Sequence, residues 1–197
     1  PINLALLDGV GAELAESTDE HYGLLVLPWS PDAAGDLGAA PMDAAILLGC
    51  STDLARSVEV LQRRRIPLVA IEAPAMDGVA AASRLAAEHL RELGHERVAL
   101  VTLSLDVDRT RGPLTPEREA ACTAYTAAER LRGAREVYPD AGGVSSAAST
   151  IDEGRRAGRA LLDVPAASRP TAVLAQSDLL AAGVVLAAEE MGIDVPR

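Results

Sequence analysis

The sequence of 197 residues predicts an α/β fold with two doubly wound lobes, each a parallel sheet covered by helices, and a cleft between the lobes. Three observations lead to this prediction. Short, continuously apolar runs alternate with longer segments whose apolar residues recur at the period of a helix, as in βαβ units. The runs lack alternating polar residues, which is typical of strands buried on both faces. The length suits one large domain or two small lobes.

The elements follow one another in the order that such lobes need. A first helix is predicted from the spacing of Leu7, Val10 and Leu14. Strands are predicted at 24–27, 45–48, 68–71, 98–101 and 172–175, with a weaker one at 136–138. Four further helices are predicted from apolar stripes, which are Leu54, Val58 and Leu61; Ala82, Ala86, Leu90 and Leu93; Ala121, Ala124, Ala128 and Leu131; and Leu180, Val184, Ala187 and Met191.

Capping residues mark the starts of two helices. Thr115 precedes Pro116, which places a cap before a proline at the first helical position. Residues 150–153 read Thr-Ile-Asp-Glu and fit a capping box. Two segments rich in Gly, Pro, Ser and Asp, 106–115 and 139–148, are predicted loops.

The boundary between the lobes is predicted at Gly94-His95, where a helix ends and a strand is about to begin. Most of the acidic excess lies before this point. The prediction is an N-terminal lobe of residues 1–94 and a C-terminal lobe of residues 95–197.

The charged residues exclude several classes of function. The net charge is −11, and every basic residue is an arginine because the sequence contains no lysine. Enzymes that need a phosphate-binding lysine, a Schiff base or a lysine general base are therefore excluded. An acidic surface repels phosphate backbones, and the run Arg63-Arg64-Arg65 is too small for a nucleic-acid footprint. This chain by itself is not expected to bind DNA.

Metal and membrane signals are absent from the sequence. Cys50 and Cys122 stand far apart without a CxxC pair, which favours two buried thiols in a reducing cytosol over a disulfide. No metal site and no cofactor are predicted. No apolar stretch approaches the length of a membrane span, and the N-terminus lacks a signal-peptide pattern, so a cytoplasmic protein is expected.

Polar residues at the strand ends are the candidate ligand contacts, because ligands of open α/β sheets bind beyond the carboxyl ends of the strands. Trp29, Ser51, Ser177 and Asp178 follow predicted strands. Trp29 suits stacking on a ligand or half-buried packing, and Ser177 or Asp178 also suits capping of the next helix. Arg118 lies in the first turn of a helix, where the dipole disfavours a cation, so it is either a ligand contact or a solvated surface residue.

The motifs of common enzyme classes are missing. The sequence contains none of GxSxG, GxGxxG, HExxH or GxxxxGK. We therefore expect a protein that is not an enzyme, although a doubly wound sugar- or nucleotide-processing enzyme stays open as an alternative because fold alone does not determine function.

A family resemblance appears along most of the chain. Residues 63–72 read RRRIPLVAIE, residues 82–102 read ASRLAAEHLRELGHERVALVT, residues 42–49 read MDAAILLG, and residues 170–196 read PTAVLAQSDLLAAGVVLAAEEMGIDVP. These strings resemble the LacI/GalR family of bacterial transcription regulators. The resemblance is to the effector-binding core, a periplasmic-binding-protein-like fold of two α/β lobes. It does not extend to the DNA-binding headpiece, a helix-turn-helix that in this family lies upstream. The chain also starts and ends inside the family pattern, which implies an incomplete core.

The resemblance implies particular site residues. Arg118 matches the family arginine that contacts the effector, and Asp178 matches the Asp of an Asn-Asp pair whose Asn is here Ser177. The loss of that amide, and the few aromatic residues, argue against a standard hexose as the effector. Ser51 and Asp77 fall near first-lobe positions that often face the effector, although Asp77 also suits a solvated loop.

The resemblance implies regulation by a small-molecule effector, expected to be sugar-like. The effector would shift the population of lobe arrangements in a homodimer. The apolar helix Leu179 to Met191, with Val184 and Val185, is the candidate self-association surface. Operator DNA would be bound only through an upstream headpiece, and no membrane partner is expected. The alternative is a solute-binding protein of a sugar transporter, which an export signal upstream would favour.

Overall fold

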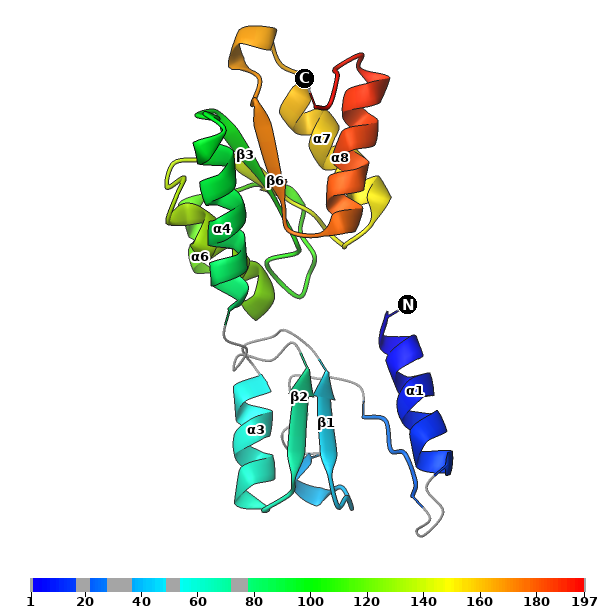
Figure 1. The fold of residues 1–197 in the computed structure, drawn as a ribbon. Coiled ribbons are helices and arrows are strands. Elements are labelled where there is room, and N and C mark those ends of the chain that lie inside the picture. The colour runs from blue at the N-terminus through cyan, green and yellow to red at the C-terminus, as the bar shows by residue number, and fades with distance from the viewer. Residues whose placement is uncertain (1, 17–21, 28–36, 49–53, 72–77, 197) are drawn as a thin grey trace. The chain divides into compact units, whose positions relative to one another are not determined.

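The computed structural model describes residues 2–16, 22–27, 37–48, 54–71 and 78–196 and divides the chain into two compact units (Figure 1). The first unit contains residues 1–49 and 54–71, and the second contains residues 50–53 and 72–197. The division therefore lies on the N-terminal side of helix α4 (Val79–Glu92) and not at Gly94-His95. The physical reason is that α4 packs on helix α6 (Tyr125–Arg135) of the second unit.

The first unit is built on a two-stranded parallel sheet. Strands β1 (Ala45–Leu48) and β2 (Leu68–Ile71) pair with Ala45 opposite Leu68, and helix α3 (Leu54–Arg63) connects them. The core gathers Leu37, Leu47, Val60, Leu61 and Ile66. This βαβ unit confirms both predicted strands and the helix between them. Helix α1 (Ile2–Glu16) covers the predicted first helix.

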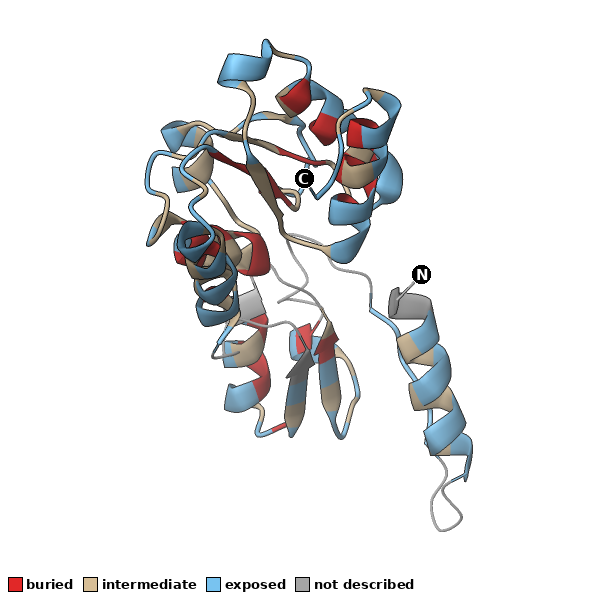
Figure 2. Ribbon diagram, turned by 45° about the horizontal axis from the view of Figure 1, so that its top comes forward, coloured by how far each residue is buried: buried red, intermediate tan, exposed pale blue. Residues whose placement is uncertain are grey.

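The predicted strand at 24–27 is wrong. Residues 22–27 form neither helix nor strand, and the side chains of 24–27 are 39% to 57% exposed. An apolar run becomes a strand only when a neighbour supplies ladder partners, and among the described residues β1 pairs with β2 alone. The other edge of β1 lacks a described neighbour. Residues 5–16 of α1 likewise include no buried position (Figure 2).

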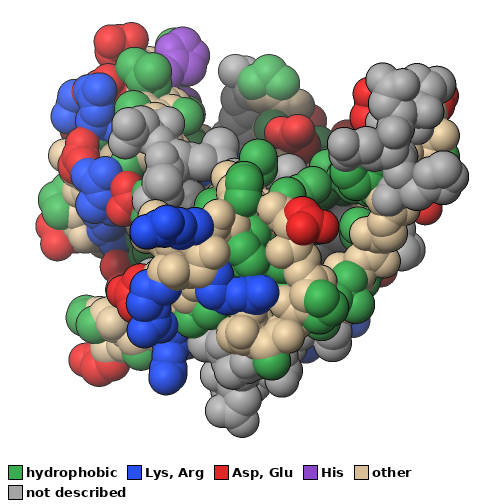
Figure 3. All heavy atoms as spheres, turned by 90° about the horizontal axis from the view of Figure 1, so that it is seen from below, with side chains coloured by type: hydrophobic (Ala, Val, Ile, Leu, Met, Phe, Trp, Pro, Cys, Tyr) green, Lys and Arg blue, Asp and Glu red, His purple; other side chains and the backbone are tan. Residues whose placement is uncertain are grey.

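Exposed apolar side chains occur in both units. On the face shown in Figure 3, acidic and basic side chains lie among apolar ones.

The second unit is a four-stranded sheet with helices on both faces (Figure 1). The strand order is β4-β5-β3-β6, in which β3 pairs with β5 and β6 in parallel and β4 pairs with β5 antiparallel. Helices α4 and α6 lie on one face, and α7 and α8 lie on the other. The bounds of the remaining elements are β3 (Val98–Thr102), β4 (Gly112–Pro113), α5 (Pro116–Ala120), β5 (Gly143–Ser145), α7 (Ile151–Leu162), a 3₁₀ turn (Ala166–Ser168), β6 (Ala172–Ala175) and α8 (Asp178–Glu190).

Strand β3 is the centre of this unit. All five of its residues are buried, and successive side chains face opposite helix layers. Leu100 packs with Leu131 and Ala134 of α6, whereas Val101 packs with Leu180 and Val184 of α8. A continuous apolar run was the expected signature of such a strand, and the structure confirms the strand and its burial.

One predicted helix and one predicted strand differ from the structure. The helix expected to continue from Pro116 through Leu131 breaks into α5 and α6, because the amides of Thr123 and Ala124 both donate to the carbonyl of buried Leu105. The weak strand at 136–138 is a turn, because α6 extends to Arg135.

The missing strands lie in the two predicted loops. β5 falls at Gly143–Ser145 and β4 at Gly112–Pro113. Both are short and rich in glycine or proline, so neither has the apolar run by which the longer strands were identified. Gly143 lies against β3 so closely that a Cβ there would meet the Leu100 carbonyl oxygen at 2.3 Å.

Helix α8 is more deeply buried than the self-association prediction assumed. Val184 is 8% exposed and packs with Ala157 and Leu180, so that part of the prediction is wrong. An arginine at this position would disturb the core before it disturbed any interface. The large apolar side chains that α8 does expose are Leu179 and Leu186.

Candidate functional site

Polar residues gather at the carboxyl edge of the second unit's sheet. The parallel strands β5, β3 and β6 all end at this edge, with Ser145, Thr102 and Gln176 at or just beyond their last residues. Neighbouring strands stand about 4.8 Å apart, so the ends of β5 and β6 lie about 10 Å from each other with β3 between them. This edge is where the sequence placed its ligand contacts in this half of the chain.

Arg118 is held at the β5 side of this edge. Its backbone amide donates to Oγ1 of Thr115, which caps α5 at 3.3 Å, with Pro116 at the first helical position as predicted. Its guanidinium donates from Nη1 to the Pro113 carbonyl at 3.0 Å. The Nη2 group donates to the Thr110 carbonyl at 2.6 Å and to Oγ of Ser145 at 2.8 Å.

These contacts restrict what Arg118 offers to a ligand. A guanidinium binds a carboxylate in two parallel ways, through Nε and Nη2 or through Nη1 and Nη2. Both hydrogens of Nη2 have partners, so neither fork is available while the contacts to Thr110 and Ser145 persist. Counted over the described residues, Nε–H and one hydrogen of Nη1 remain, and each suits a single acceptor such as a hydroxyl.

The loop that Arg118 holds has a conformation that requires glycine. Gly112 has a φ of 148°, which residues with a Cβ rarely adopt, and a Cβ there would lie 2.9 Å from Nη1 of Arg118. The arginine therefore packs directly against the loop backbone.

A second arginine ties the same loop to helix α7. Arg111 binds the carboxylate of Glu153 through Nε and Nη2, at 2.8 Å and 2.7 Å, and the amide of Ala147 donates to Glu153 Oε2 at 2.8 Å. Thr150 caps α7 by accepting from the Glu153 amide, which confirms the cap, but the Glu153 side chain is used for Arg111 instead of completing the capping box. The hydrogen bonds and charge of Arg111 lower the pKa of Glu153 against the opposing effect of burial.

This pair predicts a pH-dependent stability. Because the folded-state pKa of Glu153 is lowered, its contribution is complete above the unfolded-state pKa of about 4.3 and is lost as the pH falls through and below that value. Glu153→Gln is expected to cost about 2 kcal/mol at pH 7, and the difference from the parent should shrink as the pH falls below the unfolded-state pKa and through the lower folded-state pKa. Urea unfolding at several pH values measures this, and a difference that stays constant with pH would contradict it.

Ser177 and Asp178 lie at the β6 side of the edge. Ser177 caps α8, since its Oγ accepts from the Leu180 amide at 3.3 Å, and Oγ of Ser149 lies 2.7 Å from the same oxygen. Asp178 is the first residue of α8 and is exposed. The loops after β5 and β6 thus meet across the end of β3.

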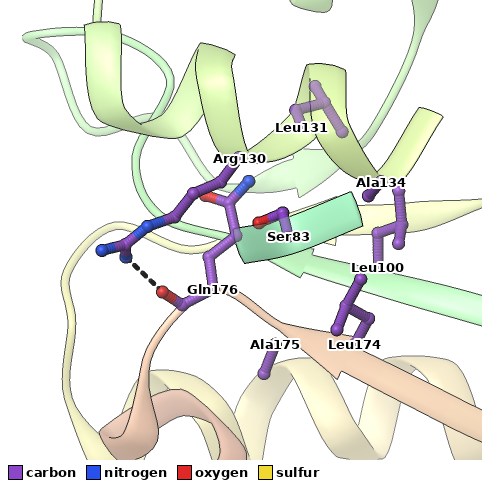
Figure 4. A pocket seen from close by; sticks show the side chains of 8 residues that line it. All are labelled: Ser83, Leu100, Arg130, Leu131, Ala134, Leu174, Ala175 and Gln176. Atoms are coloured by element: carbon purple, nitrogen blue, oxygen red, sulfur yellow. Dashed lines mark hydrogen bonds between the residues drawn. The ribbon is translucent and has the colours of Figure 1, made fainter. Parts of the chain in front are cut away.

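Gln176 and Arg130 complete this side (Figure 4). The Gln176 side chain accepts from the Leu103 amide and donates to the Ala127 carbonyl, both at 3.0 Å, and Arg130 donates to the Gln176 carbonyl. The pocket that they line together with Ser83 has a volume of about 10 Å³, which is about enough for one water molecule. It is too small to be an effector site.

The structure describes three of the six predicted site residues. Arg118, Ser177 and Asp178 share the carboxyl edge of one sheet, whereas Trp29, Ser51 and Asp77 lie outside the described residues. Ser145 and Ser149 were not predicted as members of this edge, because their only sequence signal was a Ser-rich loop after a strand too short to predict. Glu153 was predicted only as part of a capping box.

No group of three or more metal-ligating side chains is found in the described part of the chain. None of its helices has the length and apolar character to cross a bilayer.

Comparison with known proteins identifies the family. Residues 87–197 match the family described as "Periplasmic binding protein-like domain". A protein of Mycolicibacterium smegmatis named an HTH-type transcriptional regulator is 30% identical in an alignment of 218 positions, gaps included, which covers 98% of this chain and 58% of that protein.

Solved structures share the fold. A LacI-family transcriptional regulator of Corynebacterium glutamicum superimposes with a TM-score of 0.73 at 23% identity, covering 96% of this chain and 60% of the other. A LacI-family regulator of Enterococcus faecium with bound ribose has a TM-score of 0.57 at 20% identity, covering 97% of this chain and 68% of the other. The chain thus spans less than two thirds of the M. smegmatis and C. glutamicum proteins. On the family match, which covers more than half of its residues, this chain belongs to the family of periplasmic binding protein-like domains.

Proposed function

We propose that the chain binds a small, hydroxyl-bearing molecule at the carboxyl edge of the second unit's sheet and thereby controls DNA binding by an upstream helix-turn-helix. The observation that carries this proposal is the fixed position of Arg118, bonded to Thr110, Pro113 and Ser145 at that edge. Arg118 also stands where the family has an effector-contacting arginine. Ser177 and Asp178 supply further polar groups on the opposite side of β3.

The N–H groups of Arg118 that remain available indicate the class of ligand. With both carboxylate-binding forks occupied by the chain itself, an uncharged polyol or sugar fits better than a sugar acid. The ribose in the E. faecium regulator is a ligand of this class. The family resemblance pairs an Asn with the Asp at this position, and here Ser177 replaces that Asn. A serine hydroxyl offers fewer hydrogen-bond donors to a hexose than an asparagine amide does.

The regulatory mechanism is a population shift. The two units are proposed to be the two lobes, and a ligand that binds one arrangement of them better than another shifts their equilibrium by its difference in affinity. In a homodimer such a shift changes how two DNA-binding heads are presented. The rival function, solute delivery to a transporter, shares the fold, but the M. smegmatis relative is named a regulator.

Calorimetric titration of the chain tests the ligand class. The panel contains ribose, ribitol, glucose, a nucleoside and ribonate, the last as a carboxylate matched to ribose. We expect one of the uncharged compounds to bind and ribonate to bind at least about tenfold more weakly, a difference of about 1.4 kcal/mol. A well-folded chain that binds none of them, or binds only ribonate, would contradict the proposal.

The proposed dimer has a separate test. Leu179 and Leu186 are the large apolar side chains that α8 exposes, so Leu186→Arg is expected to convert a dimer into monomers. Light scattering measures the mass, and Leu85→Arg on the exposed face of α4 is the matched control. A Leu186→Arg chain that stays dimeric would place the interface elsewhere.

A further inference from the structure

Helix α5, which carries Arg118, is too short to determine its own orientation. It has five residues, Pro116–Ala120, and helices of this length are unstable without tertiary contacts. The direction in which the Arg118 side chain leaves α5 therefore depends on what holds this helix in place.

Glu119, the neighbour of Arg118, supplies such a contact. Its carboxylate accepts from Nη2 of Arg135 at 2.6 Å and from Nε at 3.3 Å, which is a two-point ion pair between α5 and the last turn of α6. The two side chains are only 22% and 21% exposed. An ion pair with two parallel bonds restrains rotation as well as distance.

Arg135 is itself firmly held, so it can serve as a fixed reference. Its Nη1 group donates to the carbonyls of Pro139 at 2.9 Å and Ala141 at 2.6 Å, with a longer contact of 3.4 Å to Tyr138. These carbonyls belong to the turn that leads into β5, the strand whose last residue, Ser145, binds Arg118. Glu119 and Arg118 thus connect α5 to the two ends of the same short segment.

We infer that Glu119 is a positioning residue of the effector site, acting through Arg118: its ion pair with Arg135 orients α5 so that the Arg118 guanidinium reaches Thr110, Pro113 and Ser145. The inference rests on the proposed function for its consequence in ligand binding. The orienting role itself is a property of the ligand-free chain and is measurable without any effector.

Nuclear magnetic resonance of the arginine side chains tests the orienting role. Hydrogen-bonded guanidinium N–H groups exchange and rotate slowly, and the signals of Arg118 are assigned by their loss in Arg118→Lys. Glu119→Gln is expected to broaden or average the Arg118 signals. Glu129→Gln is the matched control, because Glu129 forms a similar two-point pair with Arg132, but within α6. Unchanged Arg118 signals in Glu119→Gln, or equal changes in the control, would overturn the inference.

Ligand titration supplies the second readout, with the compound of the panel that binds the parent, or ribose if several do. Glu119→Gln is expected to raise its dissociation constant by about tenfold, as supporting residues behind a contact residue often do, while Glu129→Gln leaves it unchanged. If Glu119→Gln alters the Arg118 signals but leaves the dissociation constant unchanged, Glu119 orients Arg118 without a role in effector binding, and the inference about the effector site is wrong. If no compound binds the parent, the proposed function fails, and the Arg118 signals alone decide whether Glu119 orients Arg118.

Discussion

Replacing Gly183 by alanine should destabilise the second unit by about 3 kcal/mol, at the upper end of overpacking effects. Helices α7 and α8 approach each other through glycine. A Cβ at Gly183 would lie 2.2 Å from the Ile151 carbonyl oxygen and 2.6 Å from both the Arg155 nitrogen and the Gly154 Cα. All three atoms are backbone, so no side-chain rotation relieves the clash and the helices must separate.

Separation of these helices opens the core behind them. Val101, Ala157, Leu180 and Val184 form one buried cluster between β3 and the helix pair. A melting temperature about 10 °C lower is the expected readout for a unit of this size. Gly142→Ala is the matched control, because a Cβ there meets nothing within 4 Å, and it should change stability by no more than about 0.5 kcal/mol. Equal effects of the two substitutions would contradict the close-packing account.

The elements that the sequence predicts correctly are those whose signal is local and strong. β3 is a continuous apolar run at the centre of its sheet, β6 is one beside it, and α3 and α4 have clear apolar stripes. Burial on both faces needs the same residue types wherever the strand lies, so composition is enough to find such a strand.

The errors occur where a distant partner decides the local structure. Residues 24–27 have the composition of a strand but no described ladder partner, and the break between α5 and α6 depends on the carbonyl of Leu105. Gly143–Ser145 forms a strand because its backbone pairs closely with β3, and not because its residues favour a strand. Periodicity within a window contains no information about such partners.

The same distinction applies to the candidate site. The caps Thr115, Thr150 and Ser177 were predictable because a cap bonds to an amide three residues away. The pair of Arg111 and Glu153 joins residues 42 positions apart, and Arg118 binds carbonyls of a loop whose path depends on Gly112. Arg118 was nominated by its place in a first helical turn and then by the family resemblance, and its bonding partners were visible only in the folded chain.

Arg118→Ala is expected to weaken binding of the effector by about 100-fold or more. A hydrogen bond to a charged group contributes about 1.5 to 3 kcal/mol, and the guanidinium has two N–H groups left for a ligand. The substitution also removes three hydrogen bonds that hold residues 110–113 against β5, so the polar edge of the variant is less ordered before the ligand binds. Ordering it again costs part of the remaining binding free energy.

Two control variants separate these effects from general damage. Arg132→Ala removes an arginine that is 57% exposed and, among the described residues, pairs with Glu129 and Glu136, so affinity should stay unchanged. Arg118→Lys keeps the charge but cannot reproduce three planar bonds, and it should lose nearly as much affinity as alanine. If lysine restores binding, a simple positive charge is what the ligand requires, and the argument for an uncharged polyol is wrong. If both Arg118 variants bind as the parent does, the guanidinium serves only the loop, and the effector contacts must be sought at Ser177 and Asp178.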